Sequence, residues 1–236
     1  MTSAQTPTAT NRLLSFLPDE DRKNLLGACD QVELALGQML NETDTHVQHV
    51  YFPTDSFISL LMAIDSRLKL EVRLVGNEGM YGAHIMLGVD IAPFDALVQG
   101  AGPALRIPVV SFLEHLDRSP ALQRILKHYL YVSMKQLARS AACNRFHLVE
   151  ERLARWLLMT MDRAHSNSFR ITHEFLAQML GVRRVGITKS MGLLQKRNLI
   201  SYSRGNVRIH NVAGLENISC HCYRDDKQTY ENILHV

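Results

Sequence analysis

Basic side chains are gathered at the start of one short amphipathic segment, residues 183–194. Ile187, Met191 and Leu194 fall on one face of a helix there, and the cations fall on the other. An arginine can donate two hydrogen bonds to O6 and N7 of guanine, so the spacing predicts contact with the major groove of DNA. The residues that we expect at this contact, including neighbours before and after the segment, are Thr172, Arg183, Arg184, Gly186, Thr188, Lys189, Arg204 and Arg208.

The elements on either side of residues 183–194 can position this segment for a contact with DNA. Thr172 is a suitable N-cap for a short helix, and Gly181 supplies the turn before the second helix. That second helix can then present its first turns to a groove about 12 Å wide. Two short strands follow, residues 199–202 and 206–210, joined by the basic turn Ser203-Arg204-Gly205. Together these elements predict a winged helix-turn-helix.

Cysteine and histidine side chains offer a second chemistry, which is metal binding. In Cys220-His221-Cys222, two thiolates one residue apart supply half of a tetrahedral ligand set. Since we expect the chain end to be flexible, this segment is predicted to be a tail without a ligand. His46 and His49 would lie on opposite faces of a strand, which disfavours a cupin-like metalloenzyme. We therefore expect no enzymatic activity, no bound metal and no cofactor.

The charges are divided unequally along the chain. The net charge is +3, yet residues 1–120 carry −7 (8 Lys and Arg, 15 Asp and Glu) and residues 121–236 carry +10 (18 against 8). The basic half is suited to a polyanion such as DNA.

We find no apolar run of roughly 18 residues, no secretory signal and, with four cysteines, no disulfide framework. The expected location is cytoplasmic, without membrane contact.

The N-terminal half has the pattern of a β domain. A short helix is predicted after Pro18, and residues 32–110 contain many short apolar segments separated by Gly, Pro, Asp and Asn. In residues 70–74, Leu70, Val72 and Leu74 alternate with two charged residues, which is typical of a half-buried strand. Many short strands with frequent turns favour a jelly roll.

Ser119-Pro120 begins a long helix, because serine is a good N-cap and proline is favoured at the first helical position. Its apolar stripe continues to about Ala142, and the helix would be about 35 Å long. Such a stripe is longer than one small domain covers, so we expect a dimer helix, with packing on its own barrel as the alternative. The stripe consists of Leu122, Leu126, Tyr129, Leu130, Ser133, Leu137 and Ala141.

From residue 11 to 212 the chain resembles the Crp/Fnr family of bacterial transcription regulators. The resemblance rests on three segments in the family's order: residues 51–59, the glycine–glutamate turn of residues 75–82, and residues 150–158. It implies an α+β fold with an N-terminal cyclic-nucleotide-binding-like β jelly roll, a long dimerisation helix and a C-terminal winged helix-turn-helix. The expected parts are a disordered lead-in (1–10), a sensor domain (11–118), the dimerisation helix (119–145), the winged helix-turn-helix DNA-binding domain (146–214) and a C-terminal tail (215–236).

The resemblance also implies a function, namely a homodimer that binds double-stranded DNA at a palindromic operator and contacts RNA polymerase. Arg184 matches the family arginine that reads guanine, and Lys189 matches a later basic contact. The residue directly after that arginine is often glutamate in the family, whereas this chain has Val185. The operator should therefore differ from the one that the family's cyclic-AMP receptor reads. The regulatory step that we expect is a rotation of the DNA-binding domains near residues 143–147.

The effector pocket of the resembling family would place Gly76, Glu78, Gly79 and Tyr81 around a ligand. Residues 88–96 contain two carboxylates and no arginine where family members hold a cyclic phosphate, so we expect no cyclic-AMP binding. Cys29 is isolated near the N-terminus, which disfavours an Fnr-type iron–sulfur cluster. A metal-, haem- or redox-sensing regulator of the same fold stays open as the alternative.

Overall fold

The computed structural model describes residues 10–64 and 69–234, so the expected lead-in lies, apart from residue 10, outside the described residues. The N-terminal elements are α1 (Arg12–Ser15), α2 (Asp19–Gly27), β1 (Asp30–Leu34), β2 (Met39–Asn41), β3 (His49–Pro53), β4 (Phe57–Ala63), β5 (Lys69–Val75), the 3-10 helix η1 (Ala83–Leu87), β6 (Asp95–Gly100), β7 (Gly102–Pro108) and α3 (Val109–Arg118). The remaining elements are α4 (Pro120–Phe146), α5 (Val149–Ala164), β8 (Ser168–Arg170), α6 (His173–Leu180), α7 (Arg184–Lys196), β9 (Ile200–Ser203), β10 (Asn206–Ile209), α8 (Val212–Ile218) and α9 (Cys222–Leu234).

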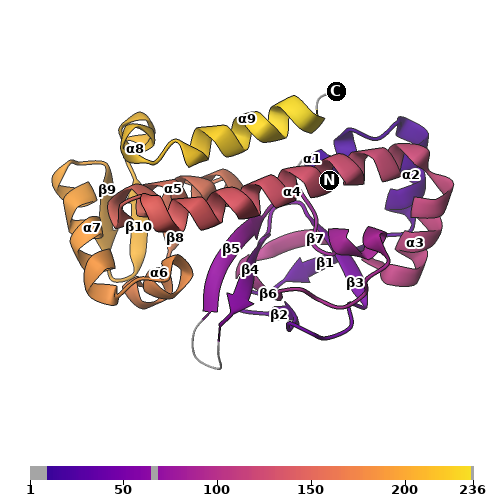
Figure 1. Ribbon diagram of the computed structural model, residues 1–236, viewed down its shortest axis with the longest axis horizontal. Coiled ribbons are helices and arrows are strands. Elements are labelled where there is room, and N and C mark those ends of the chain that lie inside the picture. The colour runs from indigo at the N-terminus through magenta and orange to yellow at the C-terminus, as the bar shows by residue number, and fades with distance from the viewer. Residues whose placement is uncertain (1–9, 65–68, 235–236) are drawn as a thin grey trace, which may run out of the picture.

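Strands β1–β7 form two antiparallel sheets, ordered β1-β7-β3 and β2-β6-β4-β5, which we call the barrel. The interior contains a continuous cluster of buried apolar side chains, among them Phe52, Ile58 and Val98. Figure 1 shows the barrel beneath one end of α4, and α5–α8 with β8–β10 at the other end. The expected α+β fold with a jelly roll, long helix and winged helix-turn-helix is confirmed.

Strand β5 does not have the predicted half-buried alternation. Leu70, Glu71, Val72 and Arg73 are all partly buried, because helices α4, α5 and α6 pack against this strand. The charged side chains of β5 therefore point to protein partners instead of water. This strand is the point at which the barrel meets the C-terminal helices.

Helix α4 begins as predicted, with the Ser119 side chain accepting a hydrogen bond from Leu122 N at 3.0 Å and proline at the first position. Its 27 residues extend to Phe146, about 40 Å at 1.5 Å per residue. The prediction that this stripe forms a dimer face is partly wrong. Four of its members are buried within the same chain, namely Leu122, Leu126, Tyr129 and Ser133. The barrel covers these side chains, so the alternative of packing on the chain's own barrel holds for them.

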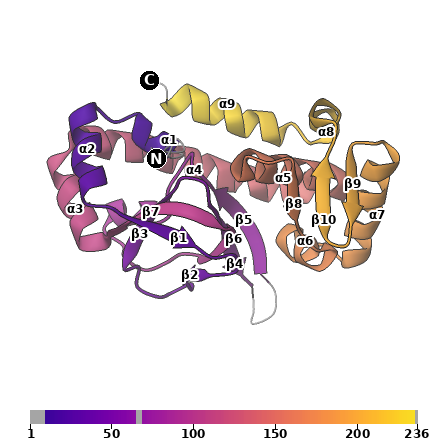
Figure 2. The same ribbon diagram turned by 180° about the vertical axis from the view of Figure 1, so that it is seen from behind.

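The C-terminal segment is helical, and the expectation of a flexible tail from residue 215 is wrong. Helix α9 lies along α4 in both views of the ribbon (Figure 1, Figure 2). Tyr230 and Leu234 are 5% and 4% exposed and belong to the same apolar cluster as the barrel interior. Tyr223, Asp226, Tyr230 and Leu234, which follow one another at spacings of three or four, are buried on one face of α9, and this burial holds the segment in place.

Within the two described ranges, no helix combines the length and apolar character needed to cross a membrane.

Candidate DNA-binding interface

Helices α6 and α7 are joined by a turn that depends on Gly181. The Thr172 side chain accepts a hydrogen bond from Phe175 N at 3.1 Å and so caps the start of α6. Gly181 then adopts φ +61°, a left-handed conformation that favours glycine. A Cβ at this position would also lie 2.8 Å from Leu70 Cδ1 of the barrel. Both constraints favour glycine at the turn that redirects the chain from α6 into α7.

Helix α7 presents its cations to solvent. Ile187, Met191 and Leu194 are at most 1% exposed and anchor the helix in the C-terminal core. The predicted contact residues Arg183, Arg184, Thr188 and Lys189 are exposed, and Gly186 is half-buried. The exposed basic face therefore covers the first turns of α7, which are the turns that a recognition helix presents to base edges.

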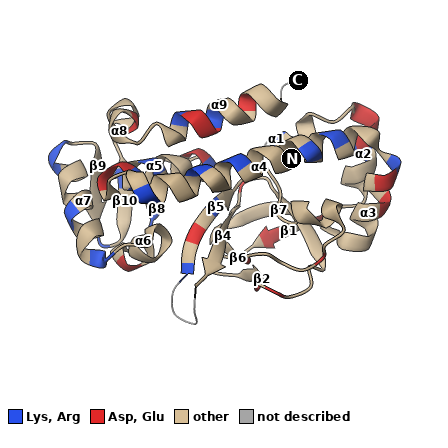
Figure 3. Ribbon diagram, viewed as in Figure 1, with Lys and Arg blue, Asp and Glu red and all other residues tan. Residues whose placement is uncertain are grey.

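The wing completes this face. Strands β9 and β10 are joined by a turn in which Arg204 and Gly205 both have positive φ, +49° and +83°. Arg204 and Arg208 are exposed, as is Thr172. Figure 3 shows Lys and Arg on α7 and at the adjoining end of the molecule, whereas most of the charged residues of α2 and α3, at the opposite end, are acidic.

A hollow between α7 and the wing brings several predicted residues together. Its lining includes Thr172, Arg184 and Arg204 from three different elements or their flanking turns. It also includes Arg170 and Tyr202, which sequence reasoning missed. Strand β8 brings Arg170 opposite Asn206 of β10, so the sheet has three strands and not the two that were predicted.

His173 is a further residue of this hollow that sequence reasoning missed. Its ring is stacked on Tyr202, with centroids 4.4 Å apart, and its Nδ1 lies 3.0 Å from Thr188 Oγ1. Burial and, to a smaller extent, the charge of Arg184 lower the pKa of His173. The ring thus braces α6 against α7 and the wing, and its lowered pKa disfavours additional positive charge near Arg184.

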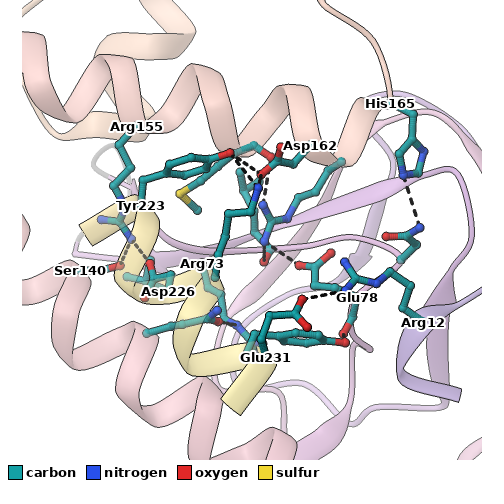
Figure 4. Close-up of a pocket in the computed structure, with 18 residues that line it drawn as sticks. Arg12, Arg73, Glu78, Ser140, Arg155, Asp162, His165, Tyr223, Asp226 and Glu231 are labelled. Carbon is teal, nitrogen blue, oxygen red and sulfur yellow. Dashed lines mark hydrogen bonds and ion pairs between the residues drawn. The ribbon is translucent and has the colours of Figure 1, made fainter. Parts of the chain in front are cut away.

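The predicted effector residues do not surround one cavity. Glu78 lines a cavity of about 280 Å³ between β5, α4, α5 and α9 (Figure 4). Gly76 and Gly79 are packed closely against Arg163 and Tyr129, where an added Cβ would lie 2.7 Å and 2.1 Å from the nearest side-chain atoms. Tyr81 is 3% exposed and lies in the barrel interior. The glycine–glutamate turn therefore supports contacts between domains.

Charged groups around this cavity are largely paired with one another. Arg163 Nη2 lies 2.6 Å from Glu78 Oε1, and Asp226 Oδ2 accepts a hydrogen bond from Arg155 Nη2 at 2.8 Å. Asp162 accepts one from the Tyr223 hydroxyl at 2.9 Å. These pairs, several of which are visible in Figure 4, join α5 to the barrel turn and to α9. The cavity thus lies where α5, α9 and the glycine–glutamate turn of the barrel meet.

A metal could be held by a different set of residues. The sulfurs of Cys220 and Cys222 lie beside Cys143 and His147 from the end of α4, and all four potential ligand atoms are within 4.8 Å of one another. The prediction that this segment supplies only half of a ligand set, with no metal to be expected, was therefore incomplete. The other half comes from residues more than 70 positions earlier in the chain, and no local motif could indicate them.

Comparison with known proteins agrees with this arrangement. Residues 151–218 match the family of Crp-like helix-turn-helix domains. No curated protein sequence matches the chain significantly.

Solved structures extend the likeness to most of the chain. FixK2 from Bradyrhizobium japonicum has a TM-score of 0.69 at 11% identity, covering 81% of this chain and 98% of its own. CLP from Xanthomonas campestris, named as a c-di-GMP-responsive global regulator, has a TM-score of 0.67 at 14% identity, covering 82% and 99%. A Crp/Fnr-family transcriptional regulator from Thermus thermophilus has a TM-score of 0.66 at 19% identity, covering 80% and 98%. The predicted resemblance to the Crp/Fnr family is confirmed.

Proposed function

We infer that this chain, which carries a Crp-like helix-turn-helix domain within the fold of Crp/Fnr regulators, acts as a sequence-specific transcription regulator. The observation that carries the proposal is the exposed basic face of α7 beside the arginines of the wing. Residues 146–214 would bind DNA, and the barrel domain of residues 11–118 would receive a signal. Selection of bound sequences from a random DNA pool by the purified full chain tests this. Enrichment of no common sequence would contradict it.

The proposed homodimer uses a face of α4 that the barrel does not cover. Tyr131 and Met134 are 51% and 68% exposed, and Ala138 and Ala141 continue the same stripe at alternating spacings of three and four. This is the spacing of a coiled-coil seam, and the two alanines permit close approach. A dyad along this seam would place two copies of α7 in successive major grooves about 34 Å apart, which requires a palindromic operator. The molar mass in sedimentation equilibrium tests the dimer.

The proposed regulator does not respond to cyclic AMP. The carboxylate of Asp95 is held by Lys69 Nζ at 2.5 Å and by Thr43 N at 2.7 Å, so the segment that would need a phosphate-binding cation contains a satisfied anion. Calorimetric titration with cyclic AMP should show no binding. Contact with RNA polymerase and a rotation of the DNA-binding domains near residues 143–147 are further parts of the proposal, supported by the fold.

Arg184→Ala should relax the base preference at one position of each half-site. Losing a bidentate contact with guanine costs about 1–3 kcal/mol of discrimination against other bases. Binding to matched oligonucleotides, measured by fluorescence anisotropy, gives this value. Arg197→Ala at the other end of α7 is the matched control, since Arg197 pairs with Glu150. Equal weakening on every sequence by Arg184→Ala would contradict the assignment.

Arg204→Ala should weaken binding to all sequences alike. A phosphate contact releases a counterion, so the slope of log affinity against log salt should flatten by about one unit. Titrations at several salt concentrations measure the slope. Arg118→Ala, at the end of α3, is the control and should leave the slope unchanged. A changed base preference with an unchanged slope would show that Arg204 reads bases instead.

A further inference from the structure

Four metal-binding side chains converge where α4 ends. Cys143 is in the last turn of α4, and His147 is the residue that caps it, so both lie on one face of the helix. Cys220 stands between α8 and α9, and Cys222 is the first residue of α9. The two segments are remote in sequence, and the packing of α9 along α4 brings them together.

The spacing of the ligand atoms suits a single ion. Cys143 Sγ lies 3.5 Å from Cys220 Sγ, and Cys222 Sγ lies 3.7 Å from His147 Nδ1. Four ligands arranged tetrahedrally at a Zn–S distance of 2.3 Å would have neighbouring sulfurs roughly 3.8 Å apart. The two ligand atoms that lie farthest apart are within 4.8 Å of each other, so they would have to move only slightly closer to bind the same ion. A cluster of several irons holds its cysteines farther apart, because the metals lie between them.

Burial and charge also favour a bound cation. Cys143, Cys220 and Cys222 are 1%, 5% and 3% exposed and form a cluster of their own, separate from the two main cores. Three thiolates, a neutral imidazole and Zn²⁺ would carry a net charge of −1. Arg152 and Arg155 interact electrostatically with Cys143 and Cys220, and both are buried. Arg155 also pairs with Asp226, whereas Arg152 donates only to Leu180 O among the described residues, so the guanidinium of Arg152 in particular places positive charge near the sulfurs.

We propose that Cys143, His147, Cys220 and Cys222 bind one Zn²⁺ in a closed, tetrahedral Cys₃His site. Thiolate and imidazole ligands in this geometry select zinc, and four protein ligands leave no position for a substrate, which is typical of a structural site. His221 is outside the set although it stands between two of the cysteines. Its ring lies edge-on to His147, with centroids 5.0 Å apart, and its Nε2 faces Asp225 at 4.0 Å.

The position of the site gives the ion a mechanical role. It would join the end of α4, immediately before α5 begins, to the junction of α8 and α9. Helix α9 is already attached to α4 through Arg139 and Asp226, whose Nη1 and Oδ1 are 2.5 Å apart. Zinc would therefore fix the angle between the long helix and the C-terminal domain. This assignment stands independently of DNA binding.

The metal content of the purified full chain tests the proposal. After reconstitution with Zn²⁺ under reducing conditions and desalting, the wild type should hold about one zinc per protomer. Cys143→Ser, Cys222→Ser and His147→Ala should each lose most of it. Cys29→Ser and His221→Ala are the matched controls and should keep it, since Cys29 lies at the end of α2 and its thiol donates to Leu25 O.

Two measurements keep the result independent of misfolding in a variant. Chelation of the wild-type zinc should lower Tm, and re-addition of Zn²⁺ should restore it. Substitution by Co²⁺ should give the visible bands of a tetrahedral site and a thiolate charge-transfer band, both weakened in Cys222→Ser. Wild-type protein that stays metal-free, that holds iron with sulfide, or that forms a Cys143–Cys220 disulfide in place of zinc binding would overturn the proposal.

Discussion

Arg163→Ala is expected to reduce the free energy of unfolding by about 3–5 kcal/mol, because it leaves a buried carboxylate without its partner. Arg163 Nη2 lies 2.6 Å from Glu78 Oε1, and the two side chains are only 10% and 17% exposed. The same guanidinium donates to Met159 O at 2.9 Å and to Leu74 O at 3.4 Å. Truncation would also loosen the packing around Gly76, whose backbone is pressed against Arg163. The contact between α5 and the barrel turn should therefore weaken sharply.

Urea unfolding followed by Trp156 fluorescence measures this effect, because the chain has one tryptophan and it lies at the same junction. Arg22→Ala is the matched control: its ion pair with Asp19 is at the surface and should contribute about 1 kcal/mol or less. Glu78→Gln in the Arg163→Ala background should recover part of the loss by removing the unpaired charge. A loss below about 1 kcal/mol in Arg163→Ala would show that the pair is solvated.

The second large effect concerns the pH dependence of stability and comes from Glu71 on β5. Its carboxyl group accepts hydrogen bonds from Ser59 Oγ at 2.6 Å and from Trp156 Nε1 at 2.8 Å. Burial raises the pKa of Glu71 from 4.5 to about 7, although these hydrogen bonds and the charges of Arg163 and Arg155 act in the opposite direction. The folded chain thus retains a proton that the unfolded chain releases. Its stability should fall as pH rises between these two values.

A pKa shift of this size corresponds to a contribution of about 3 kcal/mol to the free energy of unfolding. This contribution is present below pH 4.5 and is lost once the pH passes 7. Glu71→Gln should remove this dependence, since an amide stays neutral and can still accept from the indole. Urea midpoints measured from pH 5 to 8 for both proteins test it. Glu114→Gln on α3, which removes an exposed carboxylate, is the control for net charge. Parallel profiles for wild type and Glu71→Gln would contradict the assignment.

The winged helix-turn-helix could be predicted from sequence because its signals are local. Thr172, Gly181 and the apolar positions of α7 each lie within a few residues of the structure that they specify. Arg170 and His173 were missed for the opposite reason. Arg170 reaches the interface only because β8 pairs with β10, and His173 gains its role by stacking on Tyr202, 29 residues later.

The helical spacing of apolar residues identified the apolar stripe of α4 but did not indicate which surface covers it. The larger side chains of the stripe, such as Leu126 and Tyr129, pack on the barrel because that surface is apolar and continuous. Of the same predicted stripe, Leu130 and Leu137 are only partly buried and Ala141 remains exposed. Likewise, the chain end was expected to be flexible, whereas Asp226 of α9 forms ion pairs with Arg139 and Arg155.

Helix α9 has a consequence for the order in which the protein is made. Tyr230 and Leu234 complete a core that otherwise consists of residues before position 133, and the Tyr230 hydroxyl donates to Glu78 O at 2.7 Å. During synthesis the N-terminal part emerges first and can begin to fold alone. It cannot acquire its final packing until Tyr230 and Leu234 have left the ribosome. A chain terminated before Tyr230 would therefore lack part of the core of its barrel domain, so that folding of the N-terminal domain depends on synthesis of a segment more than 120 residues later.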